Sequence, residues 1–157
     1  MKTGALKHTA KSGGKGAVVQ DMLRELLRVG RSVRFKVASG SMRPALLEND
    51  EVTVEGTRGA IACGDIVVYR KSGKMTVHRV VMKLGGRVIT KGDALYRMDR
   101  PIAAEKIMGK VIEIRRKKGR NAGRIDMRVP SRVMMGKICA LISLLKASRS
   151  LFRCIPG

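Results

Sequence analysis

The chain has 157 residues, and its 34 basic and 12 acidic side chains give it a net charge of +22. This length is enough for one domain with a real core, which must be aliphatic and methionine-rich because aromatic residues make up only 3% of the chain. We expect no secretory signal peptide and no transmembrane helix. No apolar run follows the basic N-terminal residues, and no stretch reaches the roughly 18–20 apolar residues that a spanning helix needs.

The positive charge is concentrated at both ends of the chain. Residues 1–36 carry a net charge of +7 and residues 115–157 one of +11, whereas residues 37–114 carry only +4. Basic ends suit an anionic membrane surface, nucleic acid or an acidic partner. Solvated, partly disordered tails have the same composition, so the charge does not identify a partner.

The three cysteines, Cys63, Cys139 and Cys154, include no Cys-x-x-Cys pair. An odd number without that spacing predicts neither a disulfide framework nor a zinc site. We therefore expect reduced structural thiols, with no metal and no other cofactor.

The N-terminal region combines a polar tail with an apolar-periodic segment. Residues 1–16 are rich in Lys, Gly, Ser and Thr and are predicted to be disordered. Residues 17–29 have the spacing of an amphipathic helix that ends at Gly30. Its apolar face is formed by six residues: Val18, Met22, Leu23, Leu26, Leu27 and Val29. We expect this face to pack on the core, with a helix lying on a membrane as the alternative.

From Ser32 the pattern becomes that of β-strands, because apolar residues alternate with basic ones. Strands are predicted at 32–38, 51–55, 65–70, 75–83, 87–90 and 109–116. Turns rich in Gly, Ser, Asn and Asp separate several of them. Pro101 is predicted to open a short helix through Met108, since proline suits the first helical position.

The C-terminal third is basic and then apolar. Residues 117–132 have no clear period and are predicted to form a linker. The run 133–147 predicts a helix of about 22 Å, shorter than a hydrocarbon core of about 30 Å. Two placements fit this helix: it caps the β core, or it lies on a membrane surface with basic residues around it.

A turn at the end of the first strand carries the main chemical signal, Ser39-Gly40-Ser41-Met42-Arg43-Pro44. A small-Gly-Ser turn can expose a hydroxyl and point backbone N–H groups toward it, which are the ingredients of a serine nucleophile beside an oxyanion hole. The hexapeptide alone also fits an ordinary loop.

A serine nucleophile needs a base, and strand 75–83 offers His78, with Lys74 just before it. His78 shares a face with Val80 and Met82, which favours an inward position. An unperturbed imidazole titrates near neutrality and so needs little tuning for this role. A histidine on an apolar face is also typical of a hydrogen-bonded core residue, and Lys74 lies near a turn where solvation is expected.

Four further motifs follow the serine turn in order: Gly64-Asp65-Ile66-Val67-Val68, Val77-His78-Arg79-Val80-Val81, Thr90-Lys91-Gly92-Asp93 and Met108-Gly109-Lys110-Val111. As an ordered set, from about Phe35 to Ile114, they resemble the motif boxes of the signal peptidase I superfamily. The histidine and the Lys-Gly-Asp box resemble the eukaryotic, archaeal and spore-former type. The common bacterial type has a lysine at the position of His78.

The resemblance implies a serine endopeptidase that cleaves a precursor or leader peptide after a small residue. Ser41 would be the nucleophile, His78 the base, and Asp99 the carboxylate that fixes the imidazole. The oxyanion hole would use the Ser41 backbone N–H and, by resemblance to the bacterial enzymes, the Ser39 hydroxyl. Asp93 is also expected to support the site, through turn geometry.

This chain departs from the family pattern between its two candidate carboxylates. Ala94-Leu95-Tyr96 stands where the family often has Asn-Asn. The choice between Asp99 and Asp93 as the third member of a triad therefore stays open, although the spacing after the Lys-Gly-Asp box favours Asp99.

The fold class implied is mainly β, a coiled β-sheet domain of the signal-peptidase and LexA-like type with an N-terminal amphipathic helix and a C-terminal apolar helix. The expected organisation is a disordered basic tail over 1–16, a peptidase domain with its helix over 17–116, and a basic linker with the apolar helix over 117–157. We expect a peripheral membrane or cytoplasmic protein whose partner is a peptide or precursor protein.

Two other functions remain open. A LexA-like self-cleaving regulator shares the fold and a Ser-Met serine, but it uses a lysine base and an N-terminal DNA-binding domain, for which one helix and a tail are too short. A non-enzymatic basic module could bind nucleic acid or anionic membrane through its ends, although the aromatic residues that stack on bases are nearly absent.

Overall fold

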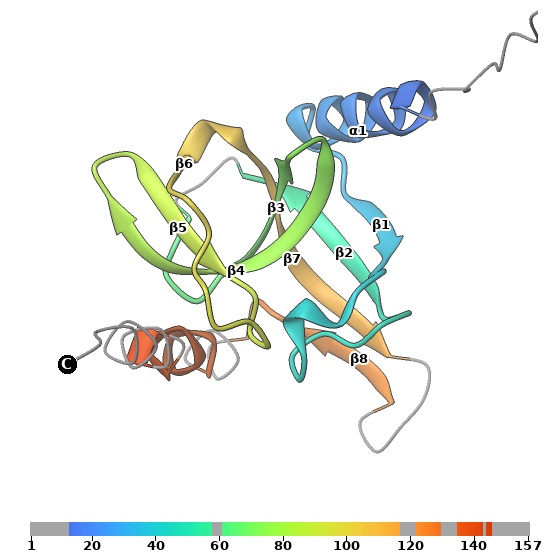
Figure 1. Cartoon of the computed structure of the whole chain (residues 1–157). Helices are drawn as coiled ribbons and strands as arrows, with labels where there is room; N and C mark the ends of the chain where they lie inside the picture. Colours follow the sequence, from blue (N-terminus) through green and yellow to red (C-terminus); the bar gives the residue numbers. More distant parts are fainter. Residues whose placement is uncertain (1–12, 58–60, 117–121, 130–134, 143, 146–157) are drawn as a thin grey trace, which may run out of the picture.

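The computed structural model describes residues 13–57, 61–116, 122–129, 135–142 and 144–145. Within these ranges the chain forms an antiparallel β-sheet with a helix at each end. Helix α1 (Gly13–Arg28) lies at one end, and the helical residues 135–142 lie at the other (Figure 1). The expected mainly β fold with N- and C-terminal helices is confirmed.

The described strands are β1 (Val33–Lys36), β2 (Glu51–Gly56), β3 (Ile66–Lys71), β4 (Lys74–Leu84), β5 (Arg87–Lys91), β6 (Ile102–Ala103), β7 (Ile107–Arg116) and β8 (Gly123–Asp126). Their order in the sheet is β1-β2-β7-β3-β4-β5-β6, and β8 pairs with the C-terminal end of β7. Two single-turn 3₁₀ helices complete the described elements, η1 (Gly40–Met42) and η2 (Ala104–Lys106).

The six strands expected from alternation are present, and their ends differ from the expected ones by at most two residues. The helix expected from Pro101 to Met108 is wrong. Ile102 and Ala103 instead pair with β5, so only the single turn of η2 separates β6 from β7. Strand β8 lies in the stretch 117–132, where the sequence shows no clear period.

Helix α1 begins at Gly13, four residues before the predicted start, so residues 13–16 of the tail that was predicted to be disordered are helical. Residues 1–12 of that tail lie outside the described residues. The predicted core face of the helix is only partly right. Leu23 and Leu27 are buried, whereas Val18 and Met22 are each more than 60% exposed. The helix touches the sheet through its C-terminal half. At this contact Gly56 of β2 lies so close to the Leu27 backbone that a Cβ on Gly56 would be only 2.1 Å from the Leu27 carbonyl oxygen. The glycine therefore permits a close approach at one point, and much of the apolar stripe projects beyond the sheet.

The C-terminal helical residues pack on the domain through small side chains. Gly136 and Ala140 are buried, and a Cβ on Gly136 would lie 2.8 Å from the Gly64 carbonyl oxygen. Leu141 and Leu145 are each more than half exposed. Among the described residues, no helix has the length and apolar character needed to cross a bilayer.

Strand β3 is buried on both faces and divides the core into two clusters. Ile66 and Val68 pack with residues of α1, β1 and β2 on one side. Val67 and Tyr69 pack with Val80 and with other apolar residues on the opposite side. A polar site carried by β3 or by its neighbour β4 is therefore shielded from water by this core.

Candidate active site

The register of three neighbouring strands brings polar side chains together. Val67 of β3 lies opposite His78 of β4, and Val80 of β4 lies opposite Thr90 of β5. Side chains alternate along a strand and opposite residues share a face. Tyr69, His78 and Thr90 therefore project to the same side of the sheet, and all three are buried.

Asp99 joins this group from the loop between β5 and β6. Its backbone N–H donates to the Thr90 carbonyl oxygen at 2.8 Å, which positions its carboxylate over the three strands. The carboxylate oxygen Oδ2 lies 2.6 Å from His78 Nδ1, 2.8 Å from Thr90 Oγ1 and 2.9 Å from Tyr69 Oη. The other oxygen, Oδ1, accepts from Lys71 Nζ, whose side chain is half exposed.

The electrostatics of this cluster keep the aspartate ionised. Burial acts to raise the pKa of Asp99, but hydrogen bonds from His78, Lys71 and Thr90 and the charge of His78 outweigh it and hold that pKa well below its usual range. Burial, with the neighbouring Asp99 charge, raises the pKa of the Tyr69 phenol, although the Thr90 hydrogen bond opposes this. Tyr69 therefore stays protonated and donates its hydrogen to Asp99.

The ionised aspartate fixes the tautomer of the imidazole. A carboxylate only accepts hydrogen bonds, so His78 Nδ1 carries the proton in its bond to Asp99. In the neutral imidazole, the remaining nitrogen Nε2 then has a free lone pair. The geometry thus supplies a base directed away from Asp99.

Ser41 lies in η1 and is partly buried. Ser41 and His78 line the same cavity of about 290 Å³, which also has Lys71 in its wall. The Ser41 hydroxyl lies 3.3 Å from the Ser39 hydroxyl. Within the described residues there is no hydrogen bond between Ser41 and His78, and catalytic hydrogen bonds are often long before substrate binds.

The backbone carbonyl of Ser41 accepts a hydrogen bond, whereas its backbone N–H is available for a substrate. The Ala94 N–H donates to the Ser41 carbonyl oxygen at 3.0 Å. A Cβ on Gly92 would lie 2.6 Å from the same oxygen, so this position requires glycine. The Ser41 N–H lies in the first turn of η1 and has no backbone acceptor in the described part of the chain. It can therefore serve as an oxyanion donor.

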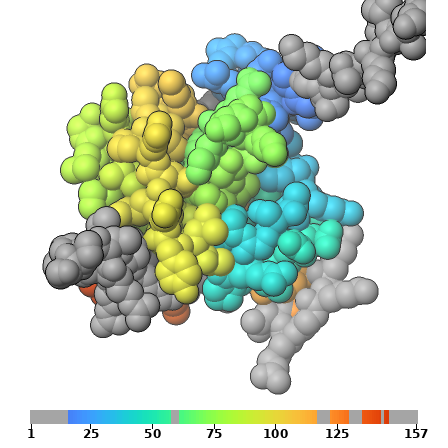
Figure 2. Space-filling model, in the orientation of Figure 1, coloured from blue at the N-terminus to red at the C-terminus, as the bar shows by residue number. Residues whose placement is uncertain are grey.

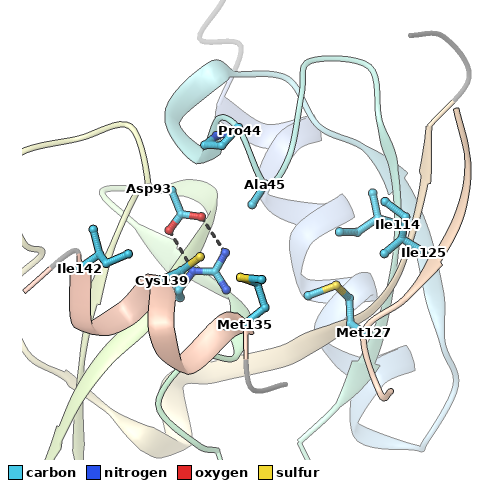
Figure 3. A pocket seen from close by; sticks show the side chains of 11 residues that line it. Pro44, Ala45, Asp93, Ile114, Ile125, Met127, Met135, Cys139 and Ile142 are labelled. Atoms are coloured by element: carbon cyan, nitrogen blue, oxygen red, sulfur yellow. Dashed lines mark hydrogen bonds and ion pairs between the residues drawn. The ribbon is translucent and has the colours of Figure 1, made fainter. Parts of the chain in front are cut away.

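Asp93 lies on the other side of β4 and has a different partner. Arg79 Nε and Nη2 donate to its two carboxylate oxygens at 2.9 and 2.6 Å, and Arg79 Nη1 donates to the Gly64 carbonyl oxygen at 2.9 Å. This ion pair borders a second, mostly apolar cavity of about 360 Å³ (Figure 3), which the C-terminal helical residues help to enclose. Asp93 therefore has no contact with the His78 network.

The structure brings three of the residues singled out from the sequence, Ser41, His78 and Ser39, around one cavity, and it places Asp99 on His78. Asp93 lies apart, and the alternative base Lys74 is exposed at the start of β4.

Sequence reasoning missed Tyr69, Thr90 and Lys71. A pattern of strand parity marks Tyr69 and Thr90 as inward residues, but it does not reveal which strands are neighbours. Lys71 carries no sequence signal at all.

Cys63 and Cys139 have free thiols. Cys154 lies outside the described residues. Among the described residues, there is no group of three or more His, Cys, Asp or Glu side chains that could hold a metal ion.

A family model described as signal peptidase, peptidase S26, matches residues 18–138. The match spans both the serine cavity and the Asp99 network. No curated protein matches the chain.

Proposed function

The chain belongs to the signal peptidase family, peptidase S26, and from this premise we propose that it is a serine endopeptidase that cleaves a precursor or leader peptide after a small residue. One observation carries the proposal. His78 is bonded through Nδ1 to a buried, ionised Asp99 and lines the same cavity as Ser41. A buried base that shares a cavity with a serine hydroxyl is the arrangement that acyl transfer by a serine requires.

The first step uses Ser41 and His78. His78 Nε2 accepts the proton of the Ser41 hydroxyl as Oγ attacks the scissile carbonyl, and the imidazole becomes an imidazolium. Asp99 stabilises this cation through Nδ1, at a hydrogen-bond distance of 2.6 Å. The imidazolium then gives its proton to the leaving amine. In the second half of the reaction, neutral His78 accepts a proton from the water that attacks the acyl-enzyme, and it returns this proton to Ser41 Oγ as the acid product leaves.

The oxyanion of the tetrahedral intermediate lies at the start of η1. The free N–H of Ser41 supplies one donor, and the Ser39 hydroxyl, 3.3 Å from the Ser41 hydroxyl, supplies a second. Asp93 acts indirectly. Its ion pair with Arg79 fixes the turn whose Gly92 and Ala94 hold the Ser41 carbonyl.

Three further residues position Asp99. Thr90 and Tyr69 donate hydrogen bonds to Oδ2, and Lys71 forms an ion pair with Oδ1. These contacts keep the carboxylate ionised and fix its orientation, so the imidazole keeps a single tautomer. Lys71 is less suited as the base itself, because its ammonium group is paired with Asp99 and half exposed.

Two observations support contact with a membrane surface. Met135, Leu141 and Leu145 of the C-terminal segment are each more than half exposed, and apolar residues of α1 are exposed as well. The net charge of +22 adds attraction to anionic lipid.

Replacing Leu141 and Leu145 with glutamine should release the protein from anionic vesicles in a sedimentation assay while its cleavage of a water-soluble peptide persists. Unchanged vesicle binding would argue that the segment serves only to cap the fold.

The peptidase proposal is tested with purified protein and a library of peptides that contain small residues, with products identified by mass spectrometry. The wild-type protein should cleave after a small residue, and Ser41→Ala should abolish cleavage. Ser32→Ala, at an exposed serine outside the site, is the matched control and should keep full activity. Cleavage restricted to the chain itself would favour the LexA-like alternative. Cleavage by Ser41→Ala at the wild-type rate would end the assignment of the nucleophile.

A further inference from the structure

Apart from the two cavities described above, an open groove lies beside Asp99. It has a volume of about 660 Å³ and is lined by the end of β3, by the start of β5 and by the segment from Met98 to Lys106. We call it the cationic groove. Figure 2 shows the face where these parts meet, with the green β3–β4 hairpin beside the yellow and gold segment that leads into β6.

The name refers to the side chains that line this groove. Five of them are basic, Arg70, Lys71, Arg87, Arg100 and Lys106, and Asp99 is the acidic one. Its carboxylate is already engaged by His78 and Lys71. Within the described residues, Arg87, Arg100 and Lys106 form no ion pair, and Arg70 makes only a long one of 3.5 Å with Asp21.

These unpaired cations give the groove a local excess of positive charge. A concave surface with charges of one sign concentrates ligands of the opposite sign. Arg87, Arg100 and Lys106 are exposed, so they remain hydrated and can exchange water for carboxylate groups at low cost. The chemistry of this groove is therefore that of an anion-binding surface.

The groove adjoins the proposed catalytic cavity, since the two share Lys71 in their linings. Lys71 lines both, because its side chain lies between the Asp99 carboxylate and the cavity that holds Ser41 and His78. A peptide in extended conformation advances about 3.3 Å per residue. A substrate bound at Ser41 can thus pass Lys71 and place its next few residues against the cations.

We propose that the cationic groove binds acidic side chains of the peptide substrate, on one side of the scissile bond. The inference rests on the proposed peptidase function and adds a substrate class to it: peptides in which aspartate or glutamate lies a few residues from the cleaved small residue. The shared wall at Lys71, beside the serine cavity, favours a substrate segment over a separate anionic partner. Because the pairs form at an exposed surface, they should weaken as salt rises.

The experiment compares two peptides with one cleavable core. One carries three aspartates near the cleavage site, on whichever side gives the faster reaction, and the other carries asparagines there. The wild-type protein should cleave the acidic peptide with a kcat/KM about 10-fold higher at low salt, which is the scale of a few exposed charge pairs. This preference should shrink at about 0.5 M salt.

The matched variants remove two positive charges in different places. Arg87→Gln with Arg100→Gln, inside the groove, should abolish the preference and leave cleavage of the asparagine peptide unchanged. Arg31→Gln with Arg115→Gln, outside the groove, should keep most of the preference. Equal cleavage of the two peptides by the wild-type protein, or equal effects of the two double variants, would overturn the proposal.

A binding measurement separates this inference from the peptidase function. Fluorescence anisotropy with Ser41→Ala protein reports peptide binding without cleavage. Tighter binding of the acidic peptide that disappears in the groove variant supports the groove, even if the wild-type protein cleaves no peptide. If both peptides bind alike while the groove variant loses binding to vesicles of anionic phospholipid, the groove recognises lipid and the proposal fails.

Discussion

Two neighbouring residues of β4, His78 and Arg79, each pair with an aspartate, and they do so on opposite faces of the strand. Arg79 holds Asp93 with two hydrogen bonds and uses its third arm on a backbone carbonyl, so all its nitrogens are engaged. His78 uses only Nδ1 on Asp99 and keeps Nε2 for the serine cavity. In the Arg79–Asp93 pair every guanidinium nitrogen is engaged, whereas in the His78–Asp99 pair the imidazole nitrogen Nε2 remains available.

The difference follows from the chemistry of the two side chains. A guanidinium is always charged and presents a rigid set of donors, which suits a permanent buried pair. An imidazole exchanges a proton near neutral pH, which suits a proton carrier. The loop after β5 supplies both carboxylates, yet only Asp99 lies among donors that fix a base. We therefore expect changes on the Asp99 side to affect turnover and changes on the Asp93 side to affect stability.

The largest effect should come from removing the base. His78→Gln should lower kcat/KM by about 10³-fold or more, because the serine then lacks a proton acceptor. The variant should stay folded, with a urea denaturation midpoint close to that of the wild-type protein. Lys74→Gln, at the exposed start of the same strand, is the control and should be nearly silent. A silent His78→Gln and an inactive Lys74→Gln would identify a lysine base.

Asp99→Asn should reduce kcat by about 10²-fold or more, and Asp93→Asn should reduce it less. The amide keeps the shape of Asp99 but cannot stabilise an imidazolium, and it allows the wrong tautomer of His78. Steady-state kinetics on one peptide measures both variants. Greater loss of kcat in a folded Asp93→Asn protein would reverse the roles assigned to the two carboxylates.

Arg79→Met should destabilise the fold by about 3–5 kcal/mol, since it leaves the Asp93 charge buried without its partner. Urea denaturation followed by circular dichroism gives the change in the free energy of unfolding. Arg79→Met combined with Asp93→Leu removes both charges and should recover a large part of the loss. No recovery in the double variant would mean that the Gly64 contact, rather than the ion pair, stabilises this face.

The smallest effect concerns stability in acid. Because the pKa of Asp99 is lower in the folded protein than its ordinary value of 3.8, the folded state is stabilised above that value. This contribution is lost as the pH falls through 3.8 toward the lower pKa of the folded state. Asp99→Asn should therefore flatten the decline of unfolding free energy below about pH 4. An equally steep decline in the variant would assign the acid sensitivity to other carboxylates.

Sequence patterns predicted the strands well because alternating or apolar runs are separated by turn residues such as Ser72-Gly73 and Gly85-Gly86. For α1 they predicted a core face of which only Leu23 and Leu27 are buried, since periodicity shows which residues are apolar but not how far a helix overlaps the sheet. That overlap depends on the contact of Gly56 with Leu27, which is distant in sequence.

The proposed site was only partly accessible from the sequence, for a similar reason. Ser41 and His78 lie in recognisable motifs, and the spacing after the Lys-Gly-Asp box favoured Asp99. Tyr69, Thr90 and Lys71 join Asp99 through strand register and a loop, so no local pattern links them. The partner of Asp93 was equally hidden, although Arg79 is adjacent to His78.

The central claim is that Ser41 and His78 act as one catalytic unit, and a double-mutant cycle on kcat/KM tests it most directly. Ser41→Ala, His78→Gln and the double variant are measured on the same peptide. Residues of one unit are strongly non-additive, so the double variant should be no slower than the slower single variant, within about threefold. Two single losses that multiply in the double variant would show that the residues act independently, and they would contradict the account.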